Sequence, residues 1–139
     1  MEISSTPPDP ERFPPDLLAN LGFVRLLESD GIQGRARVEY TASSTWAHSG
    51  GTTIQGGLIT AWLDNCMAFA LAARAPDVAV ASVEMKVSFL DRTAPGAVLA
   101  AAWIRREGGA VAFLEAELTS EGGRVLATAS STVRLLRKK

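Results

Sequence analysis

The sequence predicts an α+β fold in which one curved antiparallel sheet wraps around a single long helix. The segment from Leu58 to Leu71 is apolar or small at nearly every position, so a helix there belongs inside a core rather than on a surface. Two candidate strands precede this segment and four follow it, and turn residues separate the strands. Because a sheet that curves around such a helix buries it economically, this element order favours the wrapped arrangement.

Length and composition predict one soluble domain. The 139 residues suffice for one sizeable core but not for two, and we expect this domain over residues 15–139, after an irregular arm over residues 1–14. Met1 to Pro15 hold five of the seven prolines and lack the apolar stretch of a signal peptide. Hydrophobic residues make up 47% of the chain, and no apolar run approaches the roughly 20 residues of a membrane span. We therefore expect no membrane partner.

Charge and cysteine content exclude several classes of protein. The net charge is -1, and the basic residues are scattered except for Arg137-Lys138-Lys139, so nucleic acid is an unexpected partner. The single cysteine, Cys66, can build neither a disulfide framework nor a cysteine-based metal site within one chain. These observations agree with a reducing cytoplasm, and we expect no metal.

The chain before the long helix predicts a short helix and a hairpin. Pro15 to Gly22 begins with proline, carries apolar residues at helical spacing and ends with glycine. Phe23 to Glu28 and Ile32 to Thr41 are candidate strands around the turn Ser29-Asp-Gly31. Within the second strand, apolar residues alternate with charged ones, as in a half-buried strand. The apolar set is Ala36, Val38 and Tyr40, and the charged set is Arg35, Arg37 and Glu39.

A loop and the long helix come next. Ala42 to Ile54 is rich in Ser, Thr and Gly and predicts a loop that leads through Gln55 to a helix start at Gly56. The helix should end at Arg74-Ala-Pro76, since proline cannot continue the hydrogen-bond ladder and disfavours helical angles in the residue before it.

Four candidate strands close the chain, with Gly-, Pro- and Asp-rich turns between them. They span Val78 to Leu90, Ala97 to Arg106, Ala110 to Ser120 and Arg124 to Leu136. An open sheet covers one side of the helix and leaves an edge strand. The uncovered side and the free edge both predict a symmetric dimer.

Asp64 is the one charged residue inside the apolar helix segment. A carboxylate buried without partners is very costly, so Asp64 must find hydrogen bonds or lie at a cleft or an interface. Alternatively, it caps a helix that begins later, at Asn65. The pair Gly56-Gly57 at the helix start leaves backbone N–H groups unpaired in the positive field of the helix dipole, as in an oxyanion hole, or simply makes a tight turn.

The stretch Gln55-Gly-Gly-Leu-Ile-Thr-Ala-Trp-Leu-Asp64-Asn65, together with the element order, resembles the hotdog-fold acyl-CoA thioesterases. Within them it is similar to the phenylacetate-pathway (PaaI)-like and thioesterase-superfamily-member-2-like group. The segment Ser82 to Gly96 resembles the family's third strand and following turn, and the likeness extends over about Gly22 to Leu136. Two positions depart, since Gln55 stands in place of the family's usual His and Ser49 in place of its Asn.

The resemblance implies hydrolysis of an acyl-CoA or aroyl-CoA thioester to the free acid and CoA. Asp64 is then the general base or the nucleophile, and Gly56 of the other subunit is the oxyanion donor. The protein is expected to form a homodimer or a dimer of dimers. Coenzyme A enters as part of the substrate, and no other cofactor is implied.

Several further residues are candidates for the same site. Gln55 can donate a hydrogen bond but cannot titrate near neutral pH, and Ser82 falls where related enzymes have a serine near the carboxylate. His48 and Ser49 are weaker catalytic candidates, because a lone loop histidine is more often just exposed. The candidates for substrate binding are Gly57, Trp46, Met67 and Arg92. The departures leave open a hotdog protein that binds acyl-CoA without turning it over; a dehydratase or hydratase is disfavoured because His48 is poorly placed.

Overall fold

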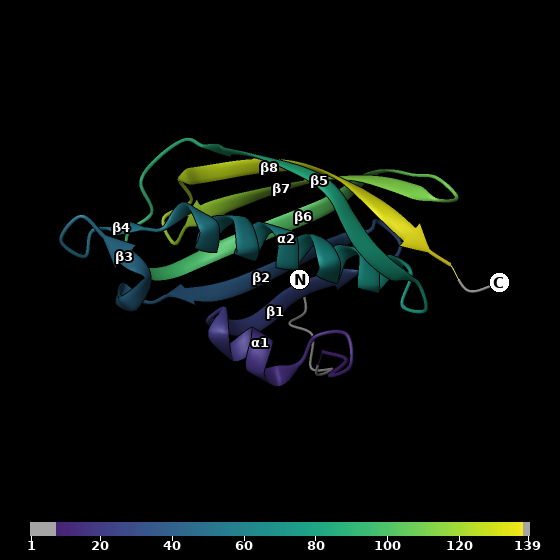
Figure 1. Cartoon of the computed structure of the whole chain (residues 1–139), viewed down its shortest axis with the longest axis horizontal. Helices are drawn as coiled ribbons and strands as arrows, with labels where there is room; N and C mark the ends of the chain where they lie inside the picture. Colours follow the sequence, from purple (N-terminus) through teal and green to yellow (C-terminus); the bar gives the residue numbers. More distant parts are fainter. Residues whose placement is uncertain (1–7, 138–139) are drawn as a thin grey trace.

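The computed structural model describes residues 8–137, and it shows a six-stranded antiparallel sheet curved around one long helix, α2 (Figure 1). The order of strands in the sheet is β1-β2-β6-β7-β8-β5. The helices are α1 (Pro15–Asn20), the single-turn η1 (Ser44–Trp46) and α2 (Gly56–Arg74). The strands are β1 (Phe23–Asp30), β2 (Arg35–Ala42), β3 (Ala47–His48), β4 (Thr53–Ile54), β5 (Ala79–Phe89), β6 (Gly96–Glu107), β7 (Val111–Ser120) and β8 (Val125–Leu136). This is the predicted fold class.

The core lies between the concave face of the sheet and the inner side of α2. Alternate strand residues point inward and are buried, as the period of two requires. From α2, Trp62 and Leu63 are fully buried, and each such side chain stabilises the fold by about 1.5–3 kcal/mol. The Trp62 indole also donates to the Leu21 carbonyl at 2.7 Å, which ties the end of α1 to the middle of α2. The inward sets predicted for β2 and β7 are Ala36, Val38 and Tyr40, and Ala112, Leu114, Ala116 and Leu118, and all are buried.

The connections differ from the prediction in two places. The hairpin turns over residues 31–34 and not over 29–31, because one carboxylate oxygen of Asp30 accepts from the N–H groups of Ile32 and Gln33, both at 2.9 Å. The predicted loop over residues 42–54 contains η1 and a two-stranded ribbon of β3 and β4. Short local bonds of this kind leave little trace in hydrophobic periodicity.

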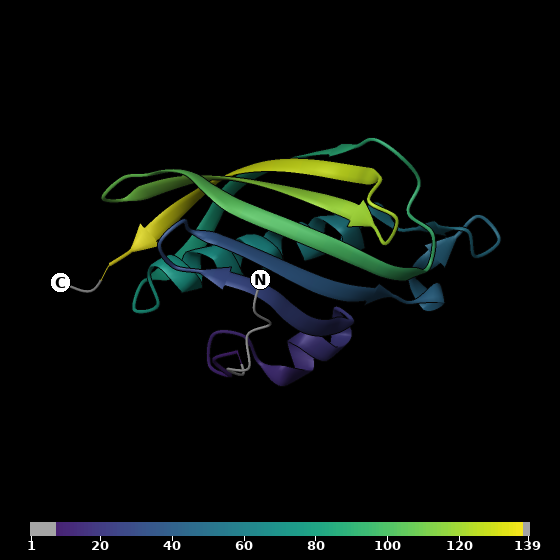
Figure 2. The same cartoon turned by 180° about the vertical axis from the view of Figure 1, so that it is seen from behind.

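The described part of the arm, residues 8–14, is irregular but packs on the core. Phe13 is buried and stacks on Phe69 of α2, with ring centroids 4.0 Å apart. Figure 2 shows this segment and α1 outside β1, at the edge of the molecule opposite β5 and β8. The remainder of the predicted arm, residues 1–7, lies outside the described residues, as do the last two lysines.

One side of α2 stays uncovered by its own chain. Gly57 and Asp64 are exposed there, and Ala61 and Ala68 are half-buried, at the spacing of one helical face. We call these four residues the α2 stripe. The strand β5 forms one edge of the sheet and carries exposed apolar side chains at or next to it: Val83, Phe89 and Leu90. The helix is therefore apolar on most of its surface but buried on only part of it.

Within residues 8–137, α2 has the length and composition of a membrane-crossing helix, contrary to the expectation that no run approaches that length. The expectation considered uninterrupted apolar residues, whereas the mean hydropathy of a window stays high when small residues and a single charged residue interrupt it. Half of its most apolar window is buried inside the fold.

Candidate active site

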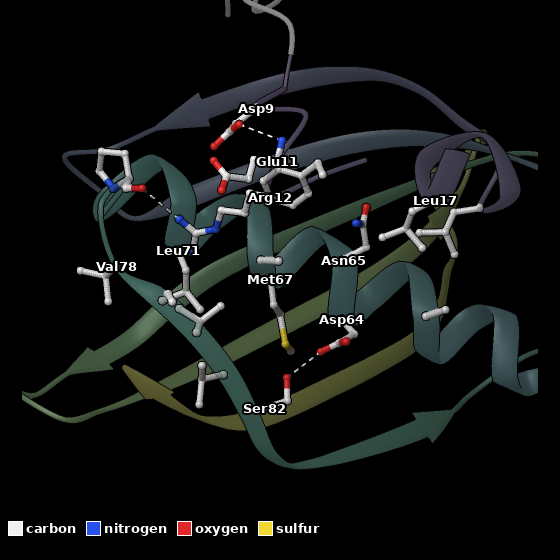
Figure 3. A pocket seen from close by; sticks show the side chains of 18 of the residues that line it. Asp9, Glu11, Arg12, Leu17, Asp64, Asn65, Met67, Leu71, Val78 and Ser82 are labelled. Carbon is white, nitrogen blue, oxygen red and sulfur yellow. Dashed lines mark hydrogen bonds between the residues drawn. The ribbon is translucent and has the colours of Figure 1, made fainter. Parts of the chain in front are cut away.

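Asp64 projects from the α2 stripe into a hollow of about 730 Å³, which we call the acid hollow (Figure 3). Four parts of the chain line it: α2, the segment from Asp9 to Leu21, the stretch from Pro76 to Ser82 that includes the start of β5, and Val133 of β8. The lining is mostly apolar and includes Met67, Leu71 and Val80. A mostly apolar hollow with a few convergent polar groups is the usual form of a small-molecule site.

A hydrogen bond from Ser82 orients the carboxylate. The Ser82 hydroxyl donates to Oδ1 of Asp64 at 2.9 Å (Figure 3). The pairing of β5 with β8 shifts register between Ser82 and Glu84, and such an irregularity redirects side chains near an active site. Among residues 8–137, no hydrogen bond involves the second oxygen, Oδ2, which can therefore take a proton or attack a carbon. Since α2 begins at Gly56, Asp64 lies in mid-helix, and the alternative of a cap for a helix starting at Asn65 is wrong.

Behind Asp64, the helix carries a buried polar group. Asn65 accepts a hydrogen bond from the Tyr40 hydroxyl, which also lies 3.4 Å from the Trp62 carbonyl. Burial raises the pKa of Tyr40 well above its usual range, and the neighbouring Cys66 and Asp64 groups add to this effect. Burial likewise raises the pKa of the Cys66 thiol, and a buried thiol that stays protonated is unreactive.

The start of α2 presents an anion-binding end. Gly56 is the first helical residue, so its N–H has no intrahelical acceptor, and the helix dipole adds positive potential there. Gln55 occupies the N-cap position, but its side chain makes no capping bond. Two backbone bonds position this segment: the N–H of Gln55 donates to the Trp46 carbonyl at 2.9 Å, and that of Ile54 donates to the Thr93 carbonyl at 2.8 Å.

A second hollow, of about 420 Å³, opens at this helix end, and we call it the glycine hollow. His48, Gly56 and Arg92 line it together with Phe89 and Thr93. A Cβ on Gly56 would meet the Phe89 ring at 3.2 Å, so the glycine lets this ring lie against the helix start. The hollow brings together the predicted oxyanion donor, Gly56, and one predicted substrate-binding residue, Arg92.

The other predicted residues lie in different places. His48 is exposed, and its Nδ1 lies 2.9 Å from the hydroxyl of Ser49, which has a positive φ of 53° in the β3–β4 turn. Met67 lines the acid hollow, and Gly57 lies on the α2 stripe. Trp46 lines neither hollow, because its ring packs against Trp62 with centroids 6.4 Å apart.

One chain does not bring its own carboxylate and glycine together. Gly56 and Asp64 are about 12 Å apart along α2 by the helical rise, and they line different hollows. A reacting carbonyl cannot touch both groups within one subunit. Within residues 8–137, no group of three or more His, Cys, Asp or Glu side chains is placed to hold a metal ion.

Two residues of interest were missed by sequence reasoning. In the described part of the chain, Nη2 of Arg12 and Oγ1 of Thr93 are buried side-chain polar atoms without a hydrogen-bond partner. Arg12 lines the acid hollow and Thr93 the glycine hollow. Arg12 belongs to the proline-rich arm and Thr93 to a turn, and neither position carries a periodic or motif signal that could have identified it.

Comparison with known proteins gives a consistent picture. A family model described as the thioesterase superfamily matches residues 51–127, more than half of the chain, and no curated protein matches. A phenylacetic acid degradation-related protein of Ralstonia eutropha JMP134 is similar in structure, with a TM-score of 0.79 and 28% identity over 86% of this chain and 89% of that one. The PaaI protein of E. coli has a TM-score of 0.82 at 17% identity, over 93% and 90% of the two chains. A hypothetical thioesterase of Streptococcus pneumoniae TIGR4, solved with coenzyme A, has a TM-score of 0.75 at 10% identity, over 83% and 87%.

Proposed function

Since the chain belongs to the thioesterase superfamily, and is a PaaI-like hotdog thioester hydrolase, we propose that it hydrolyses an acyl-CoA or aroyl-CoA thioester with Asp64 and the partner subunit's Gly56. The observation that carries this proposal is the placement of Asp64. Its carboxylate is held by Ser82, faces a mostly apolar hollow and lies on the one side of α2 that its own sheet leaves uncovered.

The proposed site needs two subunits. The α2 stripe and the β5 edge meet where Ser82 bonds to Asp64, and a two-fold axis would pair each of these surfaces with its own copy. Small residues at Gly57, Ala61 and Ala68 allow a second α2 to approach closely. An antiparallel second helix then carries its Gly56 toward Asp64 of the first, which removes the separation of about 12 Å found within one chain.

The chemistry follows from these two groups. Oδ2 of Asp64 either takes a proton from a water that attacks the thioester carbon or attacks that carbon itself to form an anhydride, which water then opens. The Gly56 N–H donates to the carbonyl oxygen as negative charge develops there, a contribution worth about 3 kcal/mol in known oxyanion holes. The carbon–sulfur bond breaks, and CoA leaves as the thiolate and takes up a proton.

The two hollows suggest how the substrate lies. The acyl group fits the apolar acid hollow of the subunit that supplies Asp64. The CoA moiety extends through the glycine hollow of the partner subunit, where an exposed arginine, Arg92 in the same numbering, can bind phosphate. Gln55 stands beside Gly56 with a free amide that can hold the carbonyl or a water. We expect the reaction to need no cofactor beyond the CoA that the substrate carries, and we expect it to take place in the cytoplasm.

A panel of short, long and aromatic CoA thioesters, with release of the free thiol as the readout, tests the proposal. Asp64→Asn keeps the size of the side chain and an oxygen acceptor for Ser82, so it should fold normally and lose about 10²–10⁴-fold in kcat. Asp77→Asn is the matched control, because Asp77 also lines the acid hollow but lies at the far end of α2. Absence of thiol release from every ester, with binding still measurable, would refute hydrolysis, and equal rates for wild type and Asp64→Asn would refute the role of Asp64.

A further inference from the structure

We propose that Arg12 determines substrate specificity by donating a hydrogen bond to an uncharged oxygen, such as a hydroxyl, at the far end of the acyl group. This proposal rests on the proposed thioesterase function. It adds a recognition element that lies in the irregular segment before α1 and not in the helix or the sheet.

The guanidinium of Arg12 is partly used and partly free. Its Nη1 lies 3.4 Å from the carbonyl oxygens of both Ala75 and Pro76, just past the end of α2. Its Nη2 is buried and has no partner among residues 8–137. Burial lowers the pKa of Arg12, and the nearby charge of Asp9 offsets part of this effect. An unpaired buried donor is costly, and a ligand that supplies an acceptor removes the cost.

The position of Arg12 matches the far end of the acid hollow. Figure 3 shows the guanidinium beside Leu71 and Val78, with Met67 between it and Asp64. Along α2, Leu71 lies about 10 Å from Asp64 by the helical rise. An acyl chain with its carbonyl at Asp64 therefore runs over apolar side chains before its end reaches Arg12.

The charges around the hollow select the kind of oxygen. Besides Asp64, the carboxylates of Asp9, Glu11 and Asp77 line this hollow, and Arg12 is the one cation among its described lining residues. A carboxylate at the end of the acyl group would meet more negative than positive charge. A hydroxyl is uncharged, accepts from the guanidinium and can donate its own proton to a neighbouring carboxylate.

The test compares three thioesters of one chain length: octanoyl-CoA, ω-hydroxyoctanoyl-CoA and octanedioyl-CoA. The wild type should favour the hydroxy ester over octanoyl-CoA in kcat/KM by about tenfold, the effect of one hydrogen bond to a charged group. Arg12→Met keeps an unbranched side chain without its charge and should bring the ratio of the two kcat/KM values to about one. Arg12→Lys should retain part of the preference for the hydroxy ester. Arg105→Met is the matched control, because Arg105 pairs with Glu115 away from this hollow and should leave the ratio unchanged.

The outcomes separate recognition from a structural role. If Arg12 only anchors its segment to the end of α2, Arg12→Met will lower kcat/KM for all three esters equally, and the unchanged ratio overturns the proposal. A preference for octanedioyl-CoA that depends on Arg12 overturns the argument for an uncharged oxygen. If no ester is hydrolysed, the proposed function fails. Dissociation constants of the same esters, measured by calorimetry for wild type and Arg12→Met, then decide the role of Arg12 independently.

Discussion

Two variants that are each nearly inactive should regain activity when their subunits are exchanged. The first is Asp64→Asn, which removes the base. The second is Gly56→Pro, which removes one backbone N–H. Proline is tolerated at the first position of a helix, and Gln55 before it, at φ -57° and ψ 132°, already has the extended conformation that proline requires of its neighbour. The new ring atoms approach Phe89, whose exposed side chain can move aside.

The size of the recovery follows from the geometry. Loss of the oxyanion donor should cost about 10²–10³-fold in kcat, and loss of the base about 10²–10⁴-fold. In an equal mixture with free exchange, half of the dimers are mixed, and each mixed dimer has one intact site and one doubly defective site. The mixture should therefore reach about a quarter of wild-type activity if each site draws Asp64 and Gly56 from different subunits.

The assay measures thiol release after the two variants are unfolded together in urea and refolded. Its control mixes wild type with a chain that carries both substitutions. This second mixture should also fall to about a quarter of wild-type activity for shared sites, but to about half if each subunit holds a complete site. Mixed dimers that form without recovering activity would refute the shared site, and so would an active protein that stays monomeric by light scattering.

Two further predictions concern single side chains. Ser82→Ala should lower kcat about tenfold with little change in KM, because Asp64 loses the hydrogen bond to its Oδ1. The control is Ser88→Ala, which alters a residue lining a different hollow and should leave kcat unchanged. An unchanged kcat for Ser82→Ala would show that this hydrogen bond does not contribute to catalysis. Burial raises the pKa of both Cys66 and Tyr40 in the folded chain, so both contribute stability that is complete below their unfolded pKa values and is lost as the pH rises above them. The free energy of unfolding, from urea titrations at one protein concentration, should fall above about pH 8.5 by roughly 1.4 kcal/mol per pH unit for the first group and more steeply above about pH 10. Cys66→Ala should remove the earlier decline, and an unaltered slope would contradict this account.

The sequence alone determined the main helices and strands of the fold and their order. The predicted helix start at Gly56 and end at Arg74 agree with the structure, and the ends of the four strands after it agree within one residue. These features are local, because an apolar period of two or a proline after a helix acts on neighbouring residues. Asp64 could be singled out for the same reason, as a charge within an apolar run.

Only the tertiary structure decided how the candidate site is built. Ser82 reaches Asp64 beside an irregularity in strand pairing, and Arg12 contacts the Ala75 carbonyl at the end of α2, 63 residues further along the chain. The sheet also determines which stripe of a nearly uniform helix stays uncovered. Such relations depend on packing between segments distant in the chain, and the periodicity of a single segment does not contain them.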